Sequence, residues 1–233
     1  GCGFIGTNFV INWFQKTDEK LINVDCMTYA SNVTCVDNPP HKNLINKVVD
    51  ISDNRMIEEI FSTYRPRAVL HFAAESHVDR SIKSADQFIK TNINGTYNLL
   101  VNSLNYFEEA GDDLKDVFKF LHVSTDEVFG SLKPEEGGFT ENSPYRPNSP
   151  YSASKAASDH LARCYFETFG LPTTVTNCSN NYGPYQHAEK FIPTVLNSLM
   201  MGEKIPIYGD GQQVRDWLYV EDHCDALMCV LDH

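Results

Sequence analysis

The chain opens with the stretch GCGFIGTNFVINWFQ (residues 1–15), in which three glycines lead into a run with helical spacing. Gly1, Gly3 and Gly6 form the pattern G-x-G-x-x-G, which lets a backbone approach a pyrophosphate at the N-terminus of a helix. A flexible turn explains the pattern alone about as well. The strand that should precede such a loop is absent, because the sequence starts at the first glycine.

Asp25 supports the cofactor interpretation of this loop. It ends the next strand-like run and lies 19 residues after Gly6. A carboxylate at this place accepts hydrogen bonds from adenosine ribose hydroxyls and repels a 2′-phosphate, which favours NAD over NADP. The alternative for Asp25 is a loop or capping acid. Because the glycines, the helix and the acid are in register, NAD is the favoured ligand.

Strand-like and helix-like segments alternate along the next part of the chain. The run AVLHFA (68–73) is continuous and β-rich, as is typical of a strand buried on both faces. The pattern predicts strands over 20–25, 47–51, 68–73, 117–124 and 173–180, and helices over 54–65, 84–109 and 150–169. This predicts an α/β fold: a Rossmann-like doubly wound parallel sheet, with its first strand missing.

The regular alternation of strand-like and helix-like segments ends at about residue 180. NNYGPYQ (180–186) is typical of a loop, and a helix over about 190–201 precedes a short strand, IPIYG (205–209). A last helix, capped near Glu221 or Asp222, follows. We predict an NAD-binding domain over 1–180 and the start of a smaller substrate-binding subdomain over 181–233, of which the helix 220–233 returns to the first domain.

Charge and cysteine usage exclude several classes of partner. The net charge of −12 argues against nucleic acid and anionic membranes. No apolar run approaches the roughly 20 residues that span a bilayer, and no signal peptide is visible. Seven scattered cysteines without a CxxC motif disfavour a disulfide framework or a metal site. We expect a cytoplasmic protein.

The segment SPYSASKAASDH (149–160) contains Tyr151 and Lys155, which share a helix face at i,i+4. An ammonium near a phenol lowers its pKa from about 10, so we expect a phenolate near neutral pH. A phenolate removes a hydroxyl proton while hydride leaves the same carbon. One Y-x-x-x-K could arise by chance, but this one follows a strand ending at Ser124–Thr125, where a hydroxyl can bind a substrate oxygen. The combination predicts alcohol–ketone redox chemistry.

The stretch HVSTDEVFG (122–130) places two carboxyl groups, Asp126 and Glu127, directly after that strand. Oxidation of a sugar C4 hydroxyl makes the C5 hydrogen acidic, and the C6 hydroxyl can then leave if an acid protonates it. Adjacent acids in a desolvated site tend to have separated pKa values, so one can hold a proton while the other does not. Two solvated acids at a strand end are the alternative.

Seven stretches together closely resemble the dTDP-glucose 4,6-dehydratase family of extended short-chain dehydrogenases/reductases. They are GCGFIGTN, HFAAESHVDRSI, TNINGTYNLL, HVSTDEVFG, NSPYSASKAASDHL, TNCSNNYGPYQ and GDGQQVRDWLYVEDH. Each motif is modest, but their combination is specific and spans essentially the whole chain. STDEV followed by YSASK separates the dehydratases from related epimerases and decarboxylases.

The resemblance implies a role for each catalytic candidate. Tyr151 is the base for the C4 hydroxyl, and Lys155 tunes it and binds the nicotinamide ribose. Thr125 hydrogen-bonds the C4 oxygen. Glu127 takes the C5 proton, and Asp126 protonates the departing C6 hydroxyl. Hydride then returns to C6, so NAD is regenerated in each turnover.

The resemblance also implies two sets of binding residues. The NAD site is lined by Gly3, Phe4, Ile5, Asp25, Asp50, Ile51, Phe72, Ala73, Ala74, Thr91, Tyr151, Lys155 and Asn181. The nucleotide sugar contacts Ser76, Thr125, Asn180, Lys190, Phe191, Pro206, Ile207, Tyr208 and Arg215. Arg215 is the favoured diphosphate partner, because a guanidinium binds phosphate oxygens through paired hydrogen bonds; a surface salt bridge is its alternative role.

The family has a strand before Gly1 and a further segment after His233, so the resemblance implies a fragment of an enzyme, with lowered stability or activity in isolation. Family habit suggests a homodimer formed by the helices near 84–109 and 150–169. Two alternative functions stay open. One is an epimerase or decarboxylase acting on a UDP-sugar, and the other is a non-catalytic NAD-binding protein on the same fold.

Overall fold

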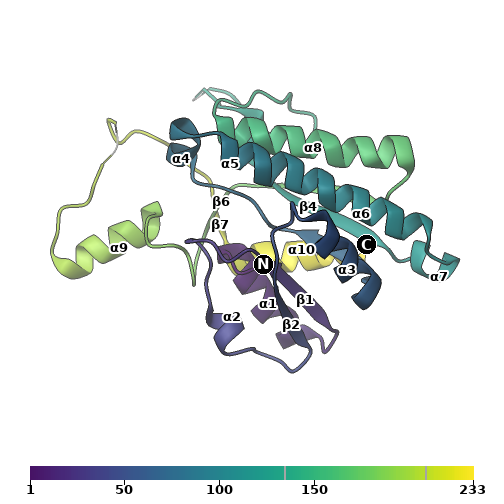
Figure 1. Ribbon diagram of the computed structural model, residues 1–233. Coiled ribbons are helices and arrows are strands. Elements are labelled where there is room, and N and C mark those ends of the chain that lie inside the picture. The colour runs from purple at the N-terminus through teal and green to yellow at the C-terminus, as the bar shows by residue number, and fades with distance from the viewer. Residues whose placement is uncertain (134, 208) are drawn as a thin grey trace. The chain divides into compact units, whose positions relative to one another are not determined.

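The structure is a computed structural model that describes residues 1–133, 135–207 and 209–233, with the side chains of residues 79, 80 and 83 also left out of the description. The chain forms two compact units (Figure 1). Unit 1 comprises Gly1–Asn23, Met27–Ile45 and Ser179–His233, and unit 2 comprises Val24–Cys26 and Asn46–Cys178. In the described part of the chain, none of the helices is long and apolar enough to cross a membrane.

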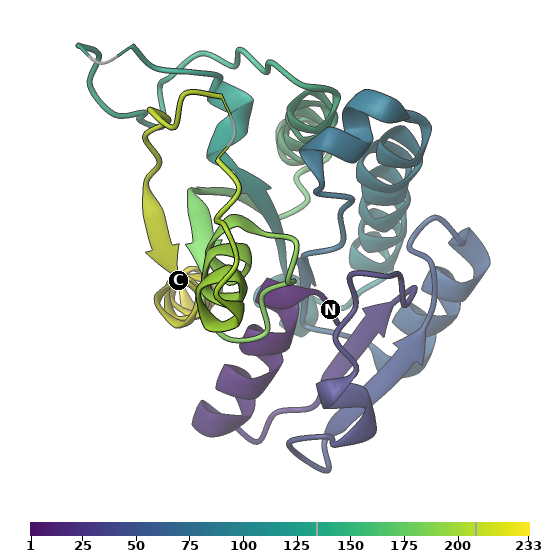
Figure 2. The ribbon, with the colours of Figure 1, turned by 90° about the vertical axis from the view of Figure 1, so that its left-hand side faces the viewer.

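Unit 1 is built around the first and last helices of the chain. α1 (Phe4–Lys16) packs against α10 (Val220–Asp232), and Asn12 and Lys16 of α1 both bind the Asp225 carboxylate, at 2.7 and 2.5 Å. The parallel strands β6 (Asn180–Tyr182) and β7 (Trp217–Tyr219) lead into α10 (Figure 2). The unit also holds α2 (Thr34–Asp37) and α9 (Phe191–Met201).

Unit 2 has a three-stranded parallel sheet in the order β3–β4–β5. β4 (Lys119–Thr125) is central, between β3 (Ala68–His71) and β5 (Thr173–Cys178), and its residues from Phe120 to Ser124 are all buried. The long helix α8 (Pro150–Phe169) packs against β4 and β5 and lies beside α6 (Thr96–Glu108) (Figure 1). Shorter helices are α3 (Asn54–Tyr64), α4 (Val78–Lys83), α5 (Asp86–Phe88) and α7 (Asp112–Lys115).

The α/β prediction is confirmed, with helices and parallel strands at most of the expected places. The strand expected over 47–51 is β2 (Leu44–Val48), which pairs with β1 (Leu21–Asp25). Val49 and Ile51, each 7% exposed, lie after β2 and pack into the core of unit 2. Their apolar character therefore reflects burial without strand pairing, and the prediction of this strand was three residues late.

Four further expectations were wrong in detail. Residues 205–207 form no strand, and Ile207 is 73% exposed, whereas Asn180–Tyr182, expected as a loop, is β6 because it finds a partner strand in β7. The helix expected over 84–109 is divided into α5, the π-helix η1 (Ile89–Gly95) and α6. The last helix is capped at Tyr219, and Glu221 and Asp222 lie in its first turn, where carboxylates stabilise the helix dipole.

Gly130 yields a prediction, because its backbone has φ +94° and ψ −133° and a Cβ there would lie 2.5 Å from the Arg146 carbonyl oxygen. Strain and overlap together predict that Gly130→Ala lowers the free energy of unfolding by about 3 kcal/mol. Gly170, with φ +71° and open space at its Cβ position, is the control. Gly170→Ala should cost about 1 kcal/mol. Urea unfolding measures both, and equal costs would contradict the role given to the Arg146 contact.

Candidate active site

Thr125 joins the central strand to the turn that carries both acids. It is the last residue of β4, opposite Cys178 of β5, and it is the N-cap of the 3-10 helix η2 (Asp126–Phe129). Its Oγ1 accepts a hydrogen bond from the Glu127 backbone N–H at 3.3 Å and donates to Asp126 Oδ1 at 3.4 Å. Asp126 and Glu127 are therefore held in a short ordered turn at the carboxyl end of the sheet.

Tyr151 and Lys155 are positioned by the N-terminus of α8. Ser149 and Ser152 cap this helix reciprocally, each accepting the other's backbone N–H at 3.0 Å, and Pro150 occupies the first turn. Tyr151 and Lys155 follow on one face and are 8% and 4% exposed. The ring of Phe88 meets the Tyr151 ring edge-on at 6.4 Å.

Three of the other catalytic candidates, Thr125, Asp126 and Glu127, influence the Tyr151 phenol. Burial raises the pKa of Tyr151 most, followed by the charges of Glu127, Cys178 and Asp126, while a hydrogen bond with the Thr125 side chain opposes the rise. Both carboxyl groups thus act on the phenol directly. Strand β4 and helix α8 thus bring Thr125 together with Tyr151, although the two residues lie 26 positions apart in the sequence.

The expected lowering of the Tyr151 pKa is wrong for this structure. The Lys155 ammonium donates to the Val123 carbonyl oxygen at 2.9 Å, while the phenol lies among carboxylates and low-dielectric surroundings. Burial also lowers the pKa of Lys155 itself to about 8, against the opposing charges of Asp159 and Cys178.

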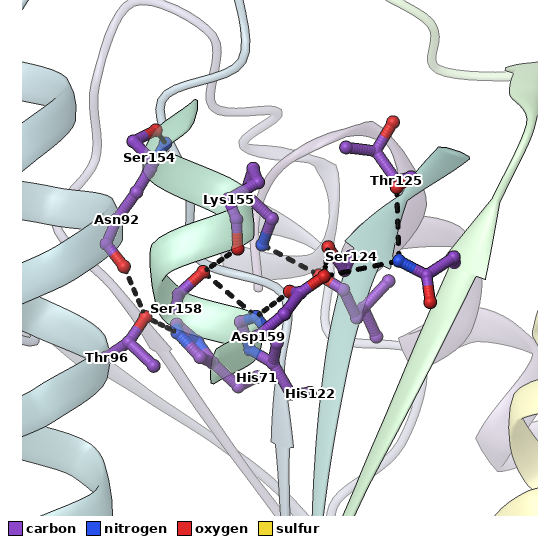
Figure 3. Close-up of polar contacts among 12 residues, drawn as sticks. His71, Asn92, Thr96, His122, Ser124, Thr125, Ser154, Lys155, Ser158 and Asp159 are labelled. Carbon is purple, nitrogen blue, oxygen red and sulfur yellow. Dashed lines mark hydrogen bonds and ion pairs between the residues drawn. The ribbon is translucent and has the colours of Figure 1, made fainter. Parts of the chain in front are cut away.

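Several polar residues that support this site were missed from the sequence. Asp159 is 2% exposed and accepts a hydrogen bond from Ser124 at 2.8 Å (Figure 3). It also accepts one from the Tyr145 hydroxyl at 3.0 Å. Asn177 of β5 donates to the Thr125 carbonyl oxygen at 3.1 Å. For Asp159, the spacing in the sequence was a signal that could have been used: Tyr151, Lys155 and Asp159 lie at i, i+4 and i+8, so they share a helix face.

A second cluster of acids in unit 2 contains two of the residues expected at the NAD site. Burial raises the pKa of Cys26, and the charges of Asp25, Asp50 and Glu75 raise it further. The strand ends that carry these acids therefore meet around one thiol. Asp50 also binds Lys90, at 3.1 Å. Asp25 thus lies near other carboxylates, and their negative charges disfavour binding of a 2′-phosphate.

Asn92 links the segment after β3 to α8. Its side chain forms reciprocal hydrogen bonds with the Glu75 backbone, at 2.8 and 3.0 Å, and donates to Ser154 Oγ at 2.8 Å. Asn92 and the predicted cofactor residue Thr91 lie in η1, and wider π-helical turns are frequent at functional sites. Phe72, Ala73 and Ala74, also expected at the NAD site, lie in the segment that Asn92 holds.

The remaining predicted NAD residues are distributed over both units. Gly3 is the N-cap of α1, and Phe4 and Ile5 begin it. Ile51 is buried, and its carbonyl accepts from Asn98 at 2.6 Å. Asn181 lies in β6 of unit 1, where its Oδ1 is 2.8 Å from His223 Nδ1.

The residues predicted to contact the sugar nucleotide are mostly exposed. Ser76 and Thr125 belong to unit 2, and the other described members of the set lie in unit 1. Lys190 caps α9, and the Phe191 ring stacks on Trp217 at 6.2 Å. Arg215 is exposed and donates to the Val214 carbonyl oxygen. Asn180 begins β6, Pro206 and Ile207 are exposed, and Tyr208 lies outside the described residues.

The glycine loop meets the steric requirements of a dinucleotide site. A Cβ on Gly6 would lie 2.4 Å from the Gly1 carbonyl oxygen, so the tight approach of the loop to its helix requires glycine at this position. A Cβ on Gly3 meets nothing within 4 Å, so the N-terminus of α1 is approachable there. The residues present fit NAD.

These features define a class: an alcohol-oxidising site of the Tyr–Lys type on a Rossmann-like frame. The model of the GDP-mannose 4,6 dehydratase family matches residues 1–233. The dTDP-glucose 4,6-dehydratase of Haemophilus influenzae is 52% identical over 99% of this chain and 69% of that protein. The dTDP-glucose 4,6-dehydratase of Neisseria meningitidis is 50% identical over 99% of this chain and 65% of its own length.

Solved structures agree with this likeness. DesIV, a dTDP-glucose 4,6-dehydratase from Streptomyces venezuelae solved with NAD, has a TM-score of 0.89 and 41% identity, over 100% of this chain and 70% of that one. UDP-glucose 4-epimerase from Thermotoga maritima has a TM-score of 0.86 and 30% identity, over 99% of this chain and 71% of its own. The chain belongs to the dTDP-glucose 4,6-dehydratase family, as predicted, and spans about two thirds of the length of its curated relatives.

Burial of Lys155 predicts a pH dependence of stability with a definite sign. Its pKa is about 8 in the folded chain and 10.5 ordinarily, so between these values the unfolded chain binds more protons. The free energy of unfolding should therefore rise with pH over this window, by about 3 kcal/mol, and Lys155→Met should lack the rise. Urea unfolding of both forms at a series of pH values measures it. A difference between them that is independent of pH would contradict the prediction.

Proposed function

We propose that the protein catalyses NAD-dependent dehydration of dTDP-glucose to the 4-keto-6-deoxy sugar. The observation that carries the proposal is the convergence of Asp126 and Glu127 on the Tyr151 phenol. Redox chemistry at C4 needs the phenol, whereas elimination across C5 and C6 needs a base and an acid beside it. An epimerase has no elimination step, so its reaction would not use the two carboxyl groups.

In this reaction, each catalytic candidate acts on one atom of the substrate. Tyr151 accepts the proton of the C4 hydroxyl, and Thr125 hydrogen-bonds the same oxygen. Glu127 removes the C5 proton, and Asp126 gives its proton to the C6 hydroxyl, which leaves as water. Because Asp126 is protonated before elimination, one of the two charges that oppose a Tyr151 phenolate is absent at the first step.

NAD, when bound, would supply the acceptor for the C4 hydride and the hydride donor for C6, while Glu127 gives its proton back to C5. Gly3, Phe4 and Ile5 hold the pyrophosphate, and Asp25 binds the adenosine ribose. Lys155 binds the nicotinamide ribose, and the other NAD residues predicted from the resemblance line the rest of the site. Ser76, Asn180, Asn181, Lys190 and Arg215 stay assigned to the ligands as predicted, with Arg215 at the diphosphate.

The division into an NAD-binding domain over 1–180 and a partial substrate subdomain over 181–233 is part of the proposal. So is a cytoplasmic location. All seven cysteines lie among the described residues and carry reduced thiols, and three of them are exposed, which suits a reducing compartment.

We further propose a homodimer that pairs the outer faces of α6 and α8. Aromatic side chains are exposed on both helices: Tyr97 is 53% exposed, Phe166 52% and Phe169 50%. The two helices pack side by side, and Tyr97 acts on the pKa of Tyr165, so Tyr97 lies near α8. Exposed apolar side chains on neighbouring helices are typical of a subunit interface.

The reaction is tested by incubating the full-length protein and NAD with dTDP-glucose and weighing the product. We expect a product lighter than the substrate by one water, and an unchanged mass would exclude dehydration. Glu127→Gln should still oxidise C4 but lower exchange of the C5 hydrogen with solvent by about 100-fold or more. Asp126→Asn is the matched variant, which should retain C5 exchange and lose water release. Normal exchange in Glu127→Gln would disqualify Glu127 as the base.

The dimer is tested by placing a charge on the proposed interface. Phe166→Glu should convert the protein to monomers in analytical ultracentrifugation, because an uncompensated carboxylate is costly to bury. Met200→Glu, at an 85% exposed position on α9, is the control and should leave the mass unchanged. A wild-type protein that sediments as a monomer would contradict the interface.

A further inference from the structure

The carboxyl end of β4 is held by three side chains at three successive residues. Lys155 donates to the Val123 carbonyl oxygen at 2.9 Å, Ser124 donates to Asp159 Oδ2 at 2.8 Å, and Asn177 donates to the Thr125 carbonyl oxygen at 3.1 Å. Figure 3 shows these contacts between α8 and the strand end. Thr125 begins the turn that carries Asp126 and Glu127, so what fixes this strand end also fixes the two acids.

Asp159 is the centre of this arrangement. Asp159 Oδ2, which accepts the hydrogen bond from Ser124, also accepts one from Asn177 at 3.3 Å and one from Tyr145 at 3.0 Å. Asp159 Oδ1 lies 3.1 Å from His122 Nε2. Tyr145 comes from the segment between η2 and α8, and its ring packs on Phe129 of η2 at 5.3 Å. One carboxylate therefore binds the strand before the acids, its neighbour β5 and the segment after the acids.

The charge of Asp159 is balanced by Lys155. Burial lowers the pKa of His122 to about 4, so the imidazole is neutral at neutral pH. Burial alone would raise the pKa of Asp159, but its contacts with His122 and Ser124 and the charge of Lys155 lower it. The groups that face Lys155 are Asp159 from its own helix, Cys178 from β5, His71 from β3 and His122 from β4.

We propose that Asp159 is a positioning residue that holds the end of β4, and with it Thr125, Asp126 and Glu127, in place against Tyr151. The proposal rests on the proposed dehydratase function for its catalytic part. The effect of the Asp159 charge on the Lys155 pKa concerns the ligand-free protein and can be tested independently of that function. Asp159 does not touch the reacting atoms, so its effect passes through Lys155 and the strand end.

Asp159→Asn is the main test, because an amide oxygen can still accept from Ser124 and Tyr145 while the charge is lost. We expect kcat to fall about tenfold or more with KM changed less than about twofold, because the reacting groups and not the substrate contacts are displaced. The rate of C5 exchange should fall more than the rate of C4 oxidation. Glu167→Gln, on the exposed face of the same helix, is the matched control and should behave as wild type.

A second readout uses the ligand-free protein. Loss of the anion should lower the pKa of Lys155 further, so the pH window in which stability rises should begin about one pH unit lower in Asp159→Asn than in wild type. The double variant Asp159→Asn, Lys155→Met should lack the window. If Asp159→Asn is too unstable to purify, Tyr145→Phe removes one contact with Asp159, and Asn177→Ala removes the contacts with Asp159 and with the Thr125 carbonyl. Each variant should slow C5 exchange selectively.

The outcomes separate the inference from the proposed function. A wild-type protein that forms no dehydrated product overturns the function, while a shifted pH window would still support the Asp159–Lys155 pairing. A wild-type protein that is active, with Asp159→Asn equal to it in kcat, in exchange and in the pH window, overturns the inference and leaves the function standing.

Discussion

The two buried charges of Lys155 and Asp159, which act on each other's pKa, are the constraint on which the geometry of the candidate site depends. Two charges at least nine-tenths buried are costly unless each has a partner and further hydrogen bonds. The structure meets this requirement by directing the ammonium to the Val123 carbonyl and the carboxylate to Ser124, Tyr145 and Asn177. Satisfying the charges therefore fixes the strand end, and the strand end fixes the turn with the two acids.

This arrangement explains why the site lies on rigid elements. β4 is the central strand of its sheet, and α8 is the longest helix of unit 2, with a capping box at its start. Gly130 ends the turn at a backbone conformation that L side chains rarely adopt. The acids are thus confined between a strand and a glycine, and the freedom left to them is that of their side chains.

The sequence was sufficient for the fold class and the family, because these depend on local spacing: G-x-G-x-x-G, STDEV and Y-x-x-x-K. The five catalytic candidates come from the same motifs and stay a prediction. The sequence was insufficient where the decisive partner is distant in the chain. Asn180–Tyr182 is a strand because Trp217–Tyr219 pairs with it, and Val49 and Ile51 are buried by packing and not by strand pairing. Asp159 looked like an ordinary helix acid until its partners on β4 and β5 were placed.

The raised pKa of Tyr151 carries a chemical consequence. A phenol beside two carboxylates resists ionisation, so the site favours the phenolate only when the charge around it is reduced. In the mechanism proposed above, a protonated Asp126 takes one such charge away before C4 oxidation, and proton capture by Glu127 removes the other during elimination. In that mechanism the two carboxyl groups assigned to the elimination also set the basicity of Tyr151, which couples the two half-reactions through one electrostatic field. An enzyme that only oxidised and reduced C4 would gain nothing from this coupling.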